Sequence, residues 1–215
     1  NPTGAVATAQ FYKDTVAFAE EHQVGIVSDF AYGAIGFDGN QPLSFLQTAG
    51  AKSVGIETYT FSKTFNMAGW RVGFAVGNAD MIAALNLIQD HLFVSIFPAI
   101  QDAAIAALAQ RKQRTDAVGQ LQAVYESRRN AFINAVRSFN WEPYVPKGAF
   151  YVLMPVPKGY TSAQFAELLL NRANVAVADA SGFGDAGEGY VRVGLTITED
   201  RLVEAANRIK ALNLF

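Results

Sequence analysis

Hydrophobic and polar residues follow one another along the first part of the chain with two periods, one typical of helices and one of short strands. Apolar spacing predicts a helix over residues 8–23, opened by a threonine that can cap it. The helical repeat rests on three residues: Phe11, Thr15 and Phe18. The apolar, partly β-branched run 24–29 predicts a buried parallel strand. Two similar runs, 53–58 and 72–77, predict strands before and after Lys63, which would hold this lysine on a rigid support.

The middle of the chain is mostly helical in its pattern. Glycine, asparagine and proline within 33–50 predict a loop that contains a short helix at 44–48. Caps and apolar repeats predict three further helices: Asn78 to His91, Pro98 to Gln110, and Gln113 to Ser138. A stripe on the last of these indicates core packing: Val118, Leu121, Tyr125, Phe132, Val136 and Phe139.

The last part of the chain has the pattern of a small α/β domain. Strands are predicted at three places: 148–154, 175–178 and 190–196. Thr161 and Gln164 form a capping box for a helix to about Ala173, and Thr198 is the predicted cap of the last helix. Its predicted buried face comprises Leu202, Ala205, Ala206, Ile209 and Leu212. A glycine-rich loop is predicted over 182–189, before the last strand.

Composition narrows the classes of function. The chain has 215 residues, of which 51% are hydrophobic and 17% are charged. This composition is sufficient for a hydrophobic core and is not that of an intrinsically disordered protein. A net charge of −2 without a basic block argues against nucleic-acid binding. The absence of cysteine excludes disulfides and thiolate zinc sites, and fits a cytoplasmic location. We find no apolar stretch long enough for a membrane span, and the two histidines have no carboxylate cluster, so no metal site is predicted.

The run from Thr60 to Gly73, Thr-Phe-Ser-Lys-Thr-Phe-Asn-Met-Ala-Gly-Trp-Arg-Val-Gly, carries the most specific chemistry. A lysine amine has a pKa near ~10.4 and becomes a useful nucleophile when it is desolvated or lies near other cations. It can then form a Schiff base with a carbonyl. Hydroxyls beside Lys63 and the forked donors of Arg71 suit a phosphate group. An aldehyde that carries a phosphate and reacts with a lysine is pyridoxal 5′-phosphate (PLP).

This run resembles the lysine signature of the class I/II aminotransferases, which are fold-type-I PLP-dependent enzymes. The resemblance implies that Lys63 holds PLP as a Schiff base, and that Thr60, Ser62 and Arg71 bind its phosphate. The chain departs from the family at Thr60, where serine or glycine is usual. Threonine keeps the hydroxyl, so a phosphate contact survives the change.

Two further motifs occur in the order that this family requires. The chain opens with Asn-Pro-Thr-Gly, which resembles the family's turn whose asparagine, here Asn1, bonds the ring hydroxyl of the cofactor. The predicted strand that ends at Asp29 would place a buried carboxylate beside the pyridine nitrogen and keep that nitrogen protonated. Tyr32 would donate to the ring oxygen, as its family counterpart does.

Arg192 interrupts an otherwise apolar strand. On the residues alone, it either faces solvent or is held for a purpose. The matching arginine of the family grips the α-carboxylate of the substrate through a bidentate pair, and lysine does not substitute cleanly for that geometry. The resemblance therefore implies a substrate-binding role for Arg192.

Taken over the whole chain, the resemblance implies an α/β fold with three parts. Residues 1–112 would belong to the PLP-binding large domain with its mainly parallel sheet, 113–138 would be a linking helix, and 139–215 a small α/β domain. The family's catalytic unit is nearly twice this long, so we expect the chain to be its C-terminal portion. The implied protein is a cytoplasmic homodimer that moves an amino group between an amino acid and a 2-oxo acid.

Three other functions stay open at this point. A PLP-dependent β-lyase shares part of the lysine run, but Arg71 and the sequence from Asp29 to Tyr32 favour transamination. A transcription regulator could carry such a domain as a ligand sensor, with its DNA-binding part ahead of this region. The chain by itself could also be inactive.

Overall fold

The computed structural model describes residues 1–112 and 117–215, and contacts divide the chain into two compact units. One unit comprises Val6–Gly36 and Gln41–Leu121 and is called here the lysine unit, because it contains Lys63. The other comprises Asn1–Ala5, Phe37–Asn40 and Gln122–Phe215 and is called the arginine unit, because it contains Arg192. The domains predicted at 1–112, 113–138 and 139–215 stay a prediction.

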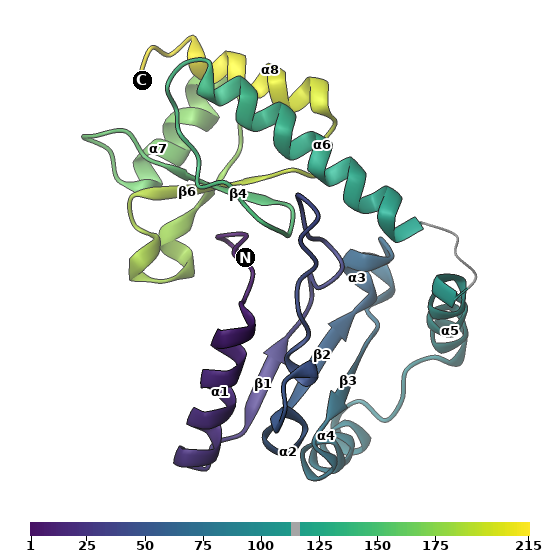
Figure 1. The fold of residues 1–215 in the computed structure, drawn as a ribbon. Helices are drawn as coiled ribbons and strands as arrows, with labels where there is room; N and C mark the ends of the chain where they lie inside the picture. Colours follow the sequence, from purple (N-terminus) through teal and green to yellow (C-terminus); the bar gives the residue numbers. More distant parts are fainter. Residues whose placement is uncertain (113–116) are drawn as a thin grey trace. The chain divides into compact units, whose positions relative to one another are not determined.

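A three-stranded mixed sheet forms the centre of the lysine unit (Figure 1). Strand β1 (Ile26–Asp29) pairs in parallel with β2 (Gly55–Thr60), and β2 pairs antiparallel with β3 (Gly73–Gly77). The predicted returning strand is thus confirmed. The prediction of a fully buried first strand is wrong, because Ile26 and Ser28 are half-buried whereas Val27 is 62% exposed. Only one face of β1 is covered.

Helices and single turns accompany this sheet in chain order: α1 (Ala9–His22), η1 (Phe45–Gln47), α2 (Ala51–Val54), α3 (Phe61–Thr64), η2 (Ala68–Trp70), α4 (Ala79–Leu92) and α5 (Pro98–Lys112). The predicted caps are confirmed at two of them. Thr8 Oγ1 accepts a hydrogen bond from the Phe11 amide at 3.1 Å, and Asn78 Oδ1 accepts one from the Met81 amide at 3.0 Å. The short helix around 44–48 is confirmed as the single turn η1.

The buried face of helix α1 is not the one that contains Phe11 and Phe18, on which the sequence prediction of the helix rested. Val16 and Ala19 are buried, and Val16 packs with Phe45 and Ala51 in a small core cluster. Phe11 and Phe18 are 58% and 53% exposed. A helical repeat in the sequence predicts that a helix forms. The segments that pack against the helix decide which of its faces is buried.

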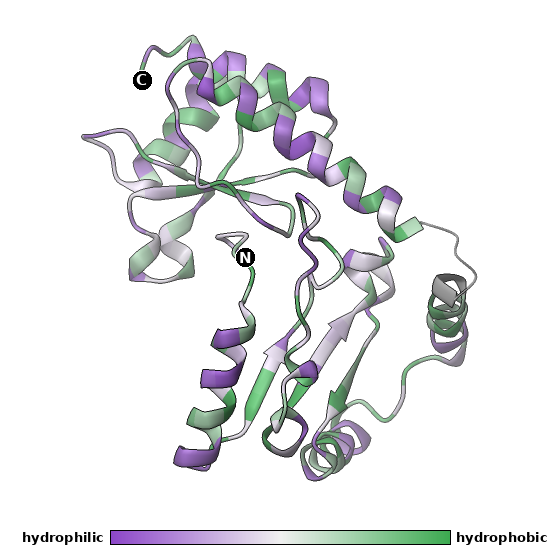
Figure 2. Cartoon of the chain, in the orientation of Figure 1, coloured by the Kyte–Doolittle hydropathy of each residue, from purple (hydrophilic) through white to green (hydrophobic). Residues whose placement is uncertain are grey.

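The arginine unit contains a second sheet in the order β4-β6-β5, in which both strand pairs are antiparallel. Its elements are β4 (Tyr151–Pro155), β5 (Ala178–Asp179), β6 (Tyr190–Gly194), α6 (Ala117–Arg137), α7 (Ser162–Leu168), a π-helical turn (Leu169–Ala173), two 3-10 turns (Ala180–Phe183 and Asp185–Gly187) and α8 (Glu199–Lys210). Helices α6 and α8 lie side by side (Figure 1). Polar and apolar residues occur together on each of them (Figure 2), as expected for amphipathic helices.

Several predictions for this unit can be compared with the structure. The linking helix was predicted from Gln113, but 113–116 lie outside the described residues, and α6 is described from Ala117 to Arg137. The Thr161–Gln164 capping box is present with both of its hydrogen bonds, at 3.0 and 3.2 Å. Helix α8 begins after Thr198 as predicted, although the Thr198 side chain makes no capping bond. The bounds of the predicted strand 175–178 are wrong, because β5 comprises only Ala178 and Asp179.

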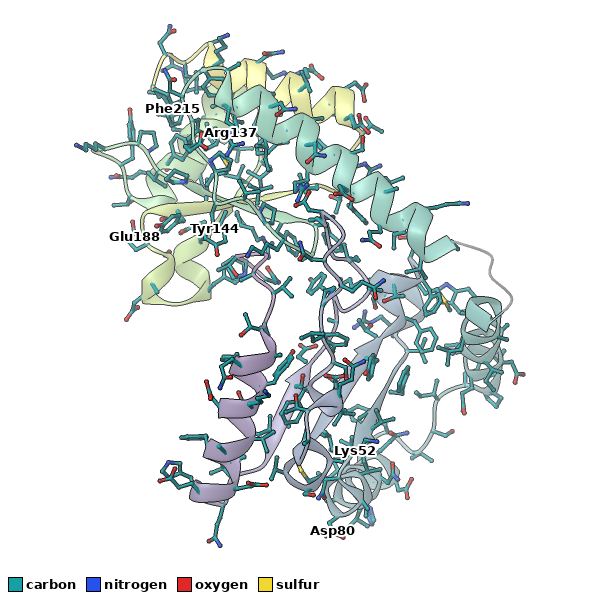
Figure 3. The ribbon with its side chains drawn as sticks, in the orientation of Figure 1. Lys52, Asp80, Arg137, Tyr144, Glu188 and Phe215 are labelled. Atoms are coloured by element: carbon teal, nitrogen blue, oxygen red, sulfur yellow. The ribbon has the colours of Figure 1, made fainter. Side chains whose placement is uncertain are left out.

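Aromatic residues fill the core of the arginine unit. Trp141 is 1% exposed, and its indole nitrogen donates to the Pro155 carbonyl at 2.8 Å. The Phe215 ring stacks on Trp141 with ring centroids 4.9 Å apart. Through this ring contact, Phe215 packs on the core of the arginine unit. Figure 3 labels Phe215, and also Arg137, the last residue of α6.

A buried guanidinium, which the sequence pattern did not reveal, anchors the segment Phe37–Asn40 to α6. The Arg129 side chain is 4% exposed and donates to both carboxylate oxygens of Asp38 at 2.7 Å, and to the Pro146 carbonyl at 3.2 Å. It also lies over the Phe37 ring, 4.7 Å from the centroid. This bidentate pair joins residues 91 positions apart in sequence.

We expect Asp38→Ala to lower the free energy of unfolding by about 2 kcal/mol, because it leaves a buried charge with fewer partners. The exposed carboxylate of Asp38 limits the effect. Thermal or urea unfolding measures this difference, with the exposed Arg137–Glu142 pair as the matched control. An Asp38→Ala protein as stable as one with Glu142→Ala would contradict the assignment.

Acid should weaken the contribution of the Asp38–Arg129 pair to the stability of the fold. Hydrogen bonds from Arg129 hold the pKa of Asp38 below its usual value. A carboxyl group with a lowered folded-state pKa stabilises the fold above its unfolded-state pKa, and that stabilisation is lost as pH falls through the folded-state pKa. The stability difference between wild type and Asp38→Asn should therefore be constant near neutral pH and shrink below about pH 4. Unfolding curves measured at a series of pH values check this; a difference that grows in acid would contradict it.

Candidate functional site

Lys63 lies in a tight strand–turn–strand connection. Strand β2 ends at Thr60, whose hydroxyl accepts a hydrogen bond from the Ser62 amide at 3.1 Å and so caps the short helix α3. The chain returns at Gly73, where a Cβ atom would lie 2.4 Å from the Tyr59 carbonyl oxygen. Only glycine allows this close approach. Lys63 is therefore fixed to the carboxyl end of the central strand.

A small apolar cluster supports this connection from within the lysine unit. Phe61 and Val72, which precede and follow the lysine turn, are 2% and 8% exposed. They pack with Ala104 of α5. The Phe61 ring also stacks on Phe65 with centroids 5.3 Å apart. The backbone of the lysine turn is thus held from both ends by buried side chains.

The structure brings Lys63 and Tyr32 together. The Lys63 side chain is half-buried, and its Nζ atom lies 6.0 Å from the centroid of the Tyr32 ring. Tyr32 is half-buried in the turn that follows β1. A cation at this distance from an aromatic face is weakly attracted to it. The amine and the phenol therefore lie on the same side of the sheet end, as a site shared by the two residues requires.

Asp29 ends β1 and lies beside β2, where it pairs in register with Thr58. In an open α/β sheet, the carboxyl ends of the strands are where ligands gather. The expected burial of this carboxylate is not observed: Asp29 is exposed, because it lies on the uncovered face of β1 together with Val27. Its place in the sheet agrees with the prediction, and its surroundings do not.

The three residues proposed for a phosphate differ in their surroundings. Ser62 is buried at 8% exposure, whereas Thr60 is half-buried. Arg71 is exposed and has a left-handed backbone with φ of 53°. Its Nη1 atom donates to the Ala68 carbonyl at 3.0 Å, which occupies one of the five donors that a guanidinium offers. Hydroxyl and guanidinium donors thus flank Lys63 in one short segment.

In the arginine unit, the Arg192 guanidinium lies against two aromatic rings. Its guanidinium lies over the Tyr151 ring at 4.2 Å and over the Phe183 ring at 4.7 Å from the centroids. Its Nη1 atom donates to Asn1 Oδ1 at 2.7 Å. Among the ion pairs of the described residues, none involves Arg192. A stacked, half-buried guanidinium favours the binding interpretation over a plain solvent-facing charge.

The predicted site residues therefore form two groups, each within one unit. The lysine unit holds Asp29, Tyr32, Thr60, Ser62, Lys63 and Arg71, and the arginine unit holds Asn1 and Arg192. In the described part of the chain no group of histidine and carboxylate side chains could hold a metal ion. No helix of that part combines the length and the apolar character needed to cross a membrane.

Sequence reasoning missed one buried acid next to the site. Glu57 lies on β2 between Ile56 and Thr58 and is fully buried. Its negative charge, added to burial, raises the pKa of the nearby Tyr12 hydroxyl. A lone acidic residue in a predicted core strand is the signal that could have revealed it.

Comparison with known proteins gives one consistent result. Residues 1–209 match the family model described as aminotransferase class I and II. The chain is 62% identical over 215 residues to L-glutamine–4-(methylsulfanyl)-2-oxobutanoate aminotransferase of Bacillus subtilis, and covers 100% of itself and 53% of that protein. It is 43% identical to LL-diaminopimelate aminotransferase 2 of Trichormus variabilis, over 98% of the chain and 53% of the relative.

Solved structures agree with these matches. The apo form of BacF from Bacillus subtilis superposes with a TM-score of 0.94 at 45% identity, covering 100% of this chain and 54% of that one. An aromatic aminotransferase from Pyrococcus horikoshii superposes with a TM-score of 0.92 at 34% identity, over 100% of this chain and 59% of that one. The chain spans about half the length of the curated relatives it matches.

Proposed function

The chain belongs to the aminotransferase class I and II family, and from this premise we propose that its protein is a PLP-dependent aminotransferase. Its fold is that of the fold-type-I PLP-dependent enzymes. The observation that carries the proposal is the lysine turn: Lys63 follows the carboxyl end of β2 within α3, its Nζ atom lies 6.0 Å from the centroid of the Tyr32 ring, and hydroxyl residues precede and follow it in sequence. The proposed substrates are an amino acid and a 2-oxo acid.

The residues present fit PLP. Thr60, Ser62 and Arg71 offer hydroxyl and guanidinium donors within the segment that holds Lys63, which suits a phosphate. Asp29, at the neighbouring strand end, would accept the pyridine N–H. We propose these four as the holders of the cofactor in the lysine unit. When bound, PLP supplies an electron sink for the carbon that loses a proton.

The remaining proposed roles concern the ring and the substrate. Tyr32 and Asn1 would donate to the ring oxygen of the cofactor, and Lys63 Nζ would bind its aldehyde carbon. Once released from that carbon, the Lys63 amine would take the α-proton of the amino acid and return it to the former aldehyde carbon of the cofactor, on the other side of the amino nitrogen. Arg192, whose guanidinium lies over the Tyr151 and Phe183 rings, would donate hydrogen bonds to the α-carboxylate of the substrate. These steps together move an amino group and predict ping-pong kinetics.

The names of the relatives favour amino-group transfer over the two other candidate functions. The relatives described above are aminotransferases by name, with glutamine and LL-diaminopimelate in those names. A β-lyase or a ligand-sensing domain gains no support from them. A cytoplasmic homodimer remains part of the proposal, on the strength of the family resemblance.

The proposal is tested by adding PLP to the protein as its gene encodes it and recording the visible absorbance. We expect a yellow band, and after borohydride reduction a PLP label on the peptide that contains Lys63. Amino acids should bleach this band, and a 2-oxo acid should restore it. A protein that forms no band, or that carries its label on another lysine, would refute the proposed function.

A further inference from the structure

Among the residues of the lysine unit whose burial the structure describes, Glu57, in the middle of β2, is the most completely buried charged side chain, at 0% exposure. Its carboxylate accepts four hydrogen bonds. Oε1 accepts from the Ser44 hydroxyl at 2.6 Å and from the Tyr59 hydroxyl. Oε2 accepts from the Phe45 amide at 2.8 Å and from the Ser28 hydroxyl at 3.1 Å. All of its acceptor capacity is used, which offsets the cost of burying a carboxylate.

The four donors come from three segments that are distant in sequence. Ser28 belongs to β1 and lies directly opposite Glu57 in the parallel register. Tyr59 belongs to β2, and Ser44 and Phe45 belong to the turn that packs on α1. The carboxylate therefore ties two neighbouring strands and a surface turn to one point.

Both strands that meet at this carboxylate end in a proposed cofactor residue. Ser28 immediately precedes Asp29, and Tyr59 immediately precedes Thr60, the cap of the lysine turn. A shift of β1 against β2 would change the distance between the Asp29 carboxylate and the Lys63 turn. The bond from Ser28 to Glu57 opposes such a shift, because it spans the two strands just before both ends.

The Tyr59 ring links Glu57 to β3 and to the residue that follows Asp29. With its hydroxyl on Glu57, the ring stacks on Phe74 of β3 with centroids 4.8 Å apart and meets Phe30 edge-on at 5.7 Å. Phe30 is the residue after Asp29, and it donates its amide to the Thr58 carbonyl at 3.0 Å. The residues before and after Asp29 are thus both connected to Glu57, one directly and one through Tyr59.

We propose that Glu57 is a positioning residue that holds Asp29 and the Lys63 turn at the separation the cofactor needs. This inference rests on the proposed function. An apolar side chain of similar volume would stabilise a core as well as a buried carboxylate does, so stability alone is a weak reason for an acid here. Four directional bonds, in contrast, fix the strand ends in a way that apolar packing does not.

The test uses Glu57→Gln in the protein as its gene encodes it, loaded with PLP. Glutamine keeps the size but replaces one acceptor oxygen by an NH₂ group, so the two bonds that this oxygen accepts are lost. We expect the label to remain on Lys63, the pH midpoint of the visible band to move by about half a unit or more, and kcat to fall roughly 10- to 100-fold with little change in KM.

Asn78→Ala is the matched control, because the Asn78 side chain caps α4 in the same unit and bonds to Met81 and Ser53, not to Asp29 or Thr60. It should lower the melting temperature and leave the pH midpoint unchanged. If Glu57→Gln does not fold, Ser28→Ala replaces it in the test, because it removes only the bond from β1 to Glu57. Ser28→Ala should move the pH midpoint in the same direction as Glu57→Gln.

The outcomes separate the two proposals. A midpoint that moves in Glu57→Gln or Ser28→Ala and not in Asn78→Ala supports the positioning role. A midpoint and a kcat that equal those of wild type, with only a lower melting temperature, overturn it while the proposed function stands. A wild-type protein without a Lys63-linked band overturns the proposed function, and this inference with it.

Discussion

Lys63→Ala is expected to reduce amino-group transfer by about 10⁴-fold or more while the protein stays folded. The variant loses the covalent anchor of PLP and the amine that would move the α-proton. Positioned proton transfer alone contributes about 10²–10⁴-fold to a rate, and the loss of the anchor adds to this. Stability should change far less than activity, because the Lys63 side chain is only half-buried.

Lys52→Ala is the matched control for this measurement. Lys52 is an exposed lysine on α2 of the same unit and is labelled in Figure 3. Single-turnover bleaching of the visible band, together with the borohydride label, gives the rate and the site of attachment. A Lys63→Ala protein that keeps more than about a tenth of the wild-type rate would show that another group does the proton transfer.

Arg192→Ala is expected to lower kcat/KM for amino acids by about 10²–10⁴-fold. Two charge-assisted hydrogen bonds to the substrate carboxylate would be lost, and each contributes about 1.5–3 kcal/mol. Arg192→Lys should recover only part of this, because an ammonium group neither forms a bidentate pair nor stacks as a guanidinium does on Tyr151 and Phe183.

Arg137→Ala controls for the loss of an arginine from the same unit. Arg137 is exposed and paired with Glu142 at 2.7 Å, so its removal should leave kcat/KM unchanged. Comparing an amino acid with the corresponding amine locates the effect, since only the amino acid carries the carboxylate. Equal losses for both substrates would show that Arg192 supports the fold and does not bind the carboxylate.

The contact between Arg192 and Asn1 joins two residues predicted for different tasks. Asn1 was assigned to the cofactor and Arg192 to the substrate, yet Asn1 Oδ1 accepts a 2.7 Å hydrogen bond from the guanidinium across 191 positions of sequence. An asparagine amide that accepts with its oxygen still has two N–H donors to offer. The bond orients Arg192 without using the donors that Asn1 would present to the ring oxygen.

Features that depend on a few consecutive residues were readable from the sequence. The Thr8 and Asn78 caps and the Thr161–Gln164 box each join residues three positions apart, and the structure contains each of them. The strand–turn–strand around Lys63 was also predicted, because an apolar run on either side of a glycine-bounded turn leaves few other paths. Local hydrogen bonding and backbone freedom determine such features.

The burial of individual side chains was decided by the tertiary structure and could not be predicted from the sequence pattern. Phe11 and Phe18 carried the helical repeat of α1 but are exposed, whereas Glu57 and Arg129 carry charge but are buried. Each of these outcomes depends on partners from other segments: Ser28 lies 29 positions from Glu57, and Asp38 lies 91 positions from Arg129. Residue type predicts average burial, and the neighbours that the chain path supplies decide the particular case.

By itself, then, the sequence determined the order of helices and strands, their caps and the family-specific lysine turn, because these follow from residues within a few positions of one another. The tertiary structure decided which faces are covered, that Arg192 is stacked between two rings and bonded to Asn1, and that a four-fold bonded Glu57 lies behind the two strand ends. A buried charge is tolerated only where donors converge on it from several segments, and that convergence is a property of the folded chain.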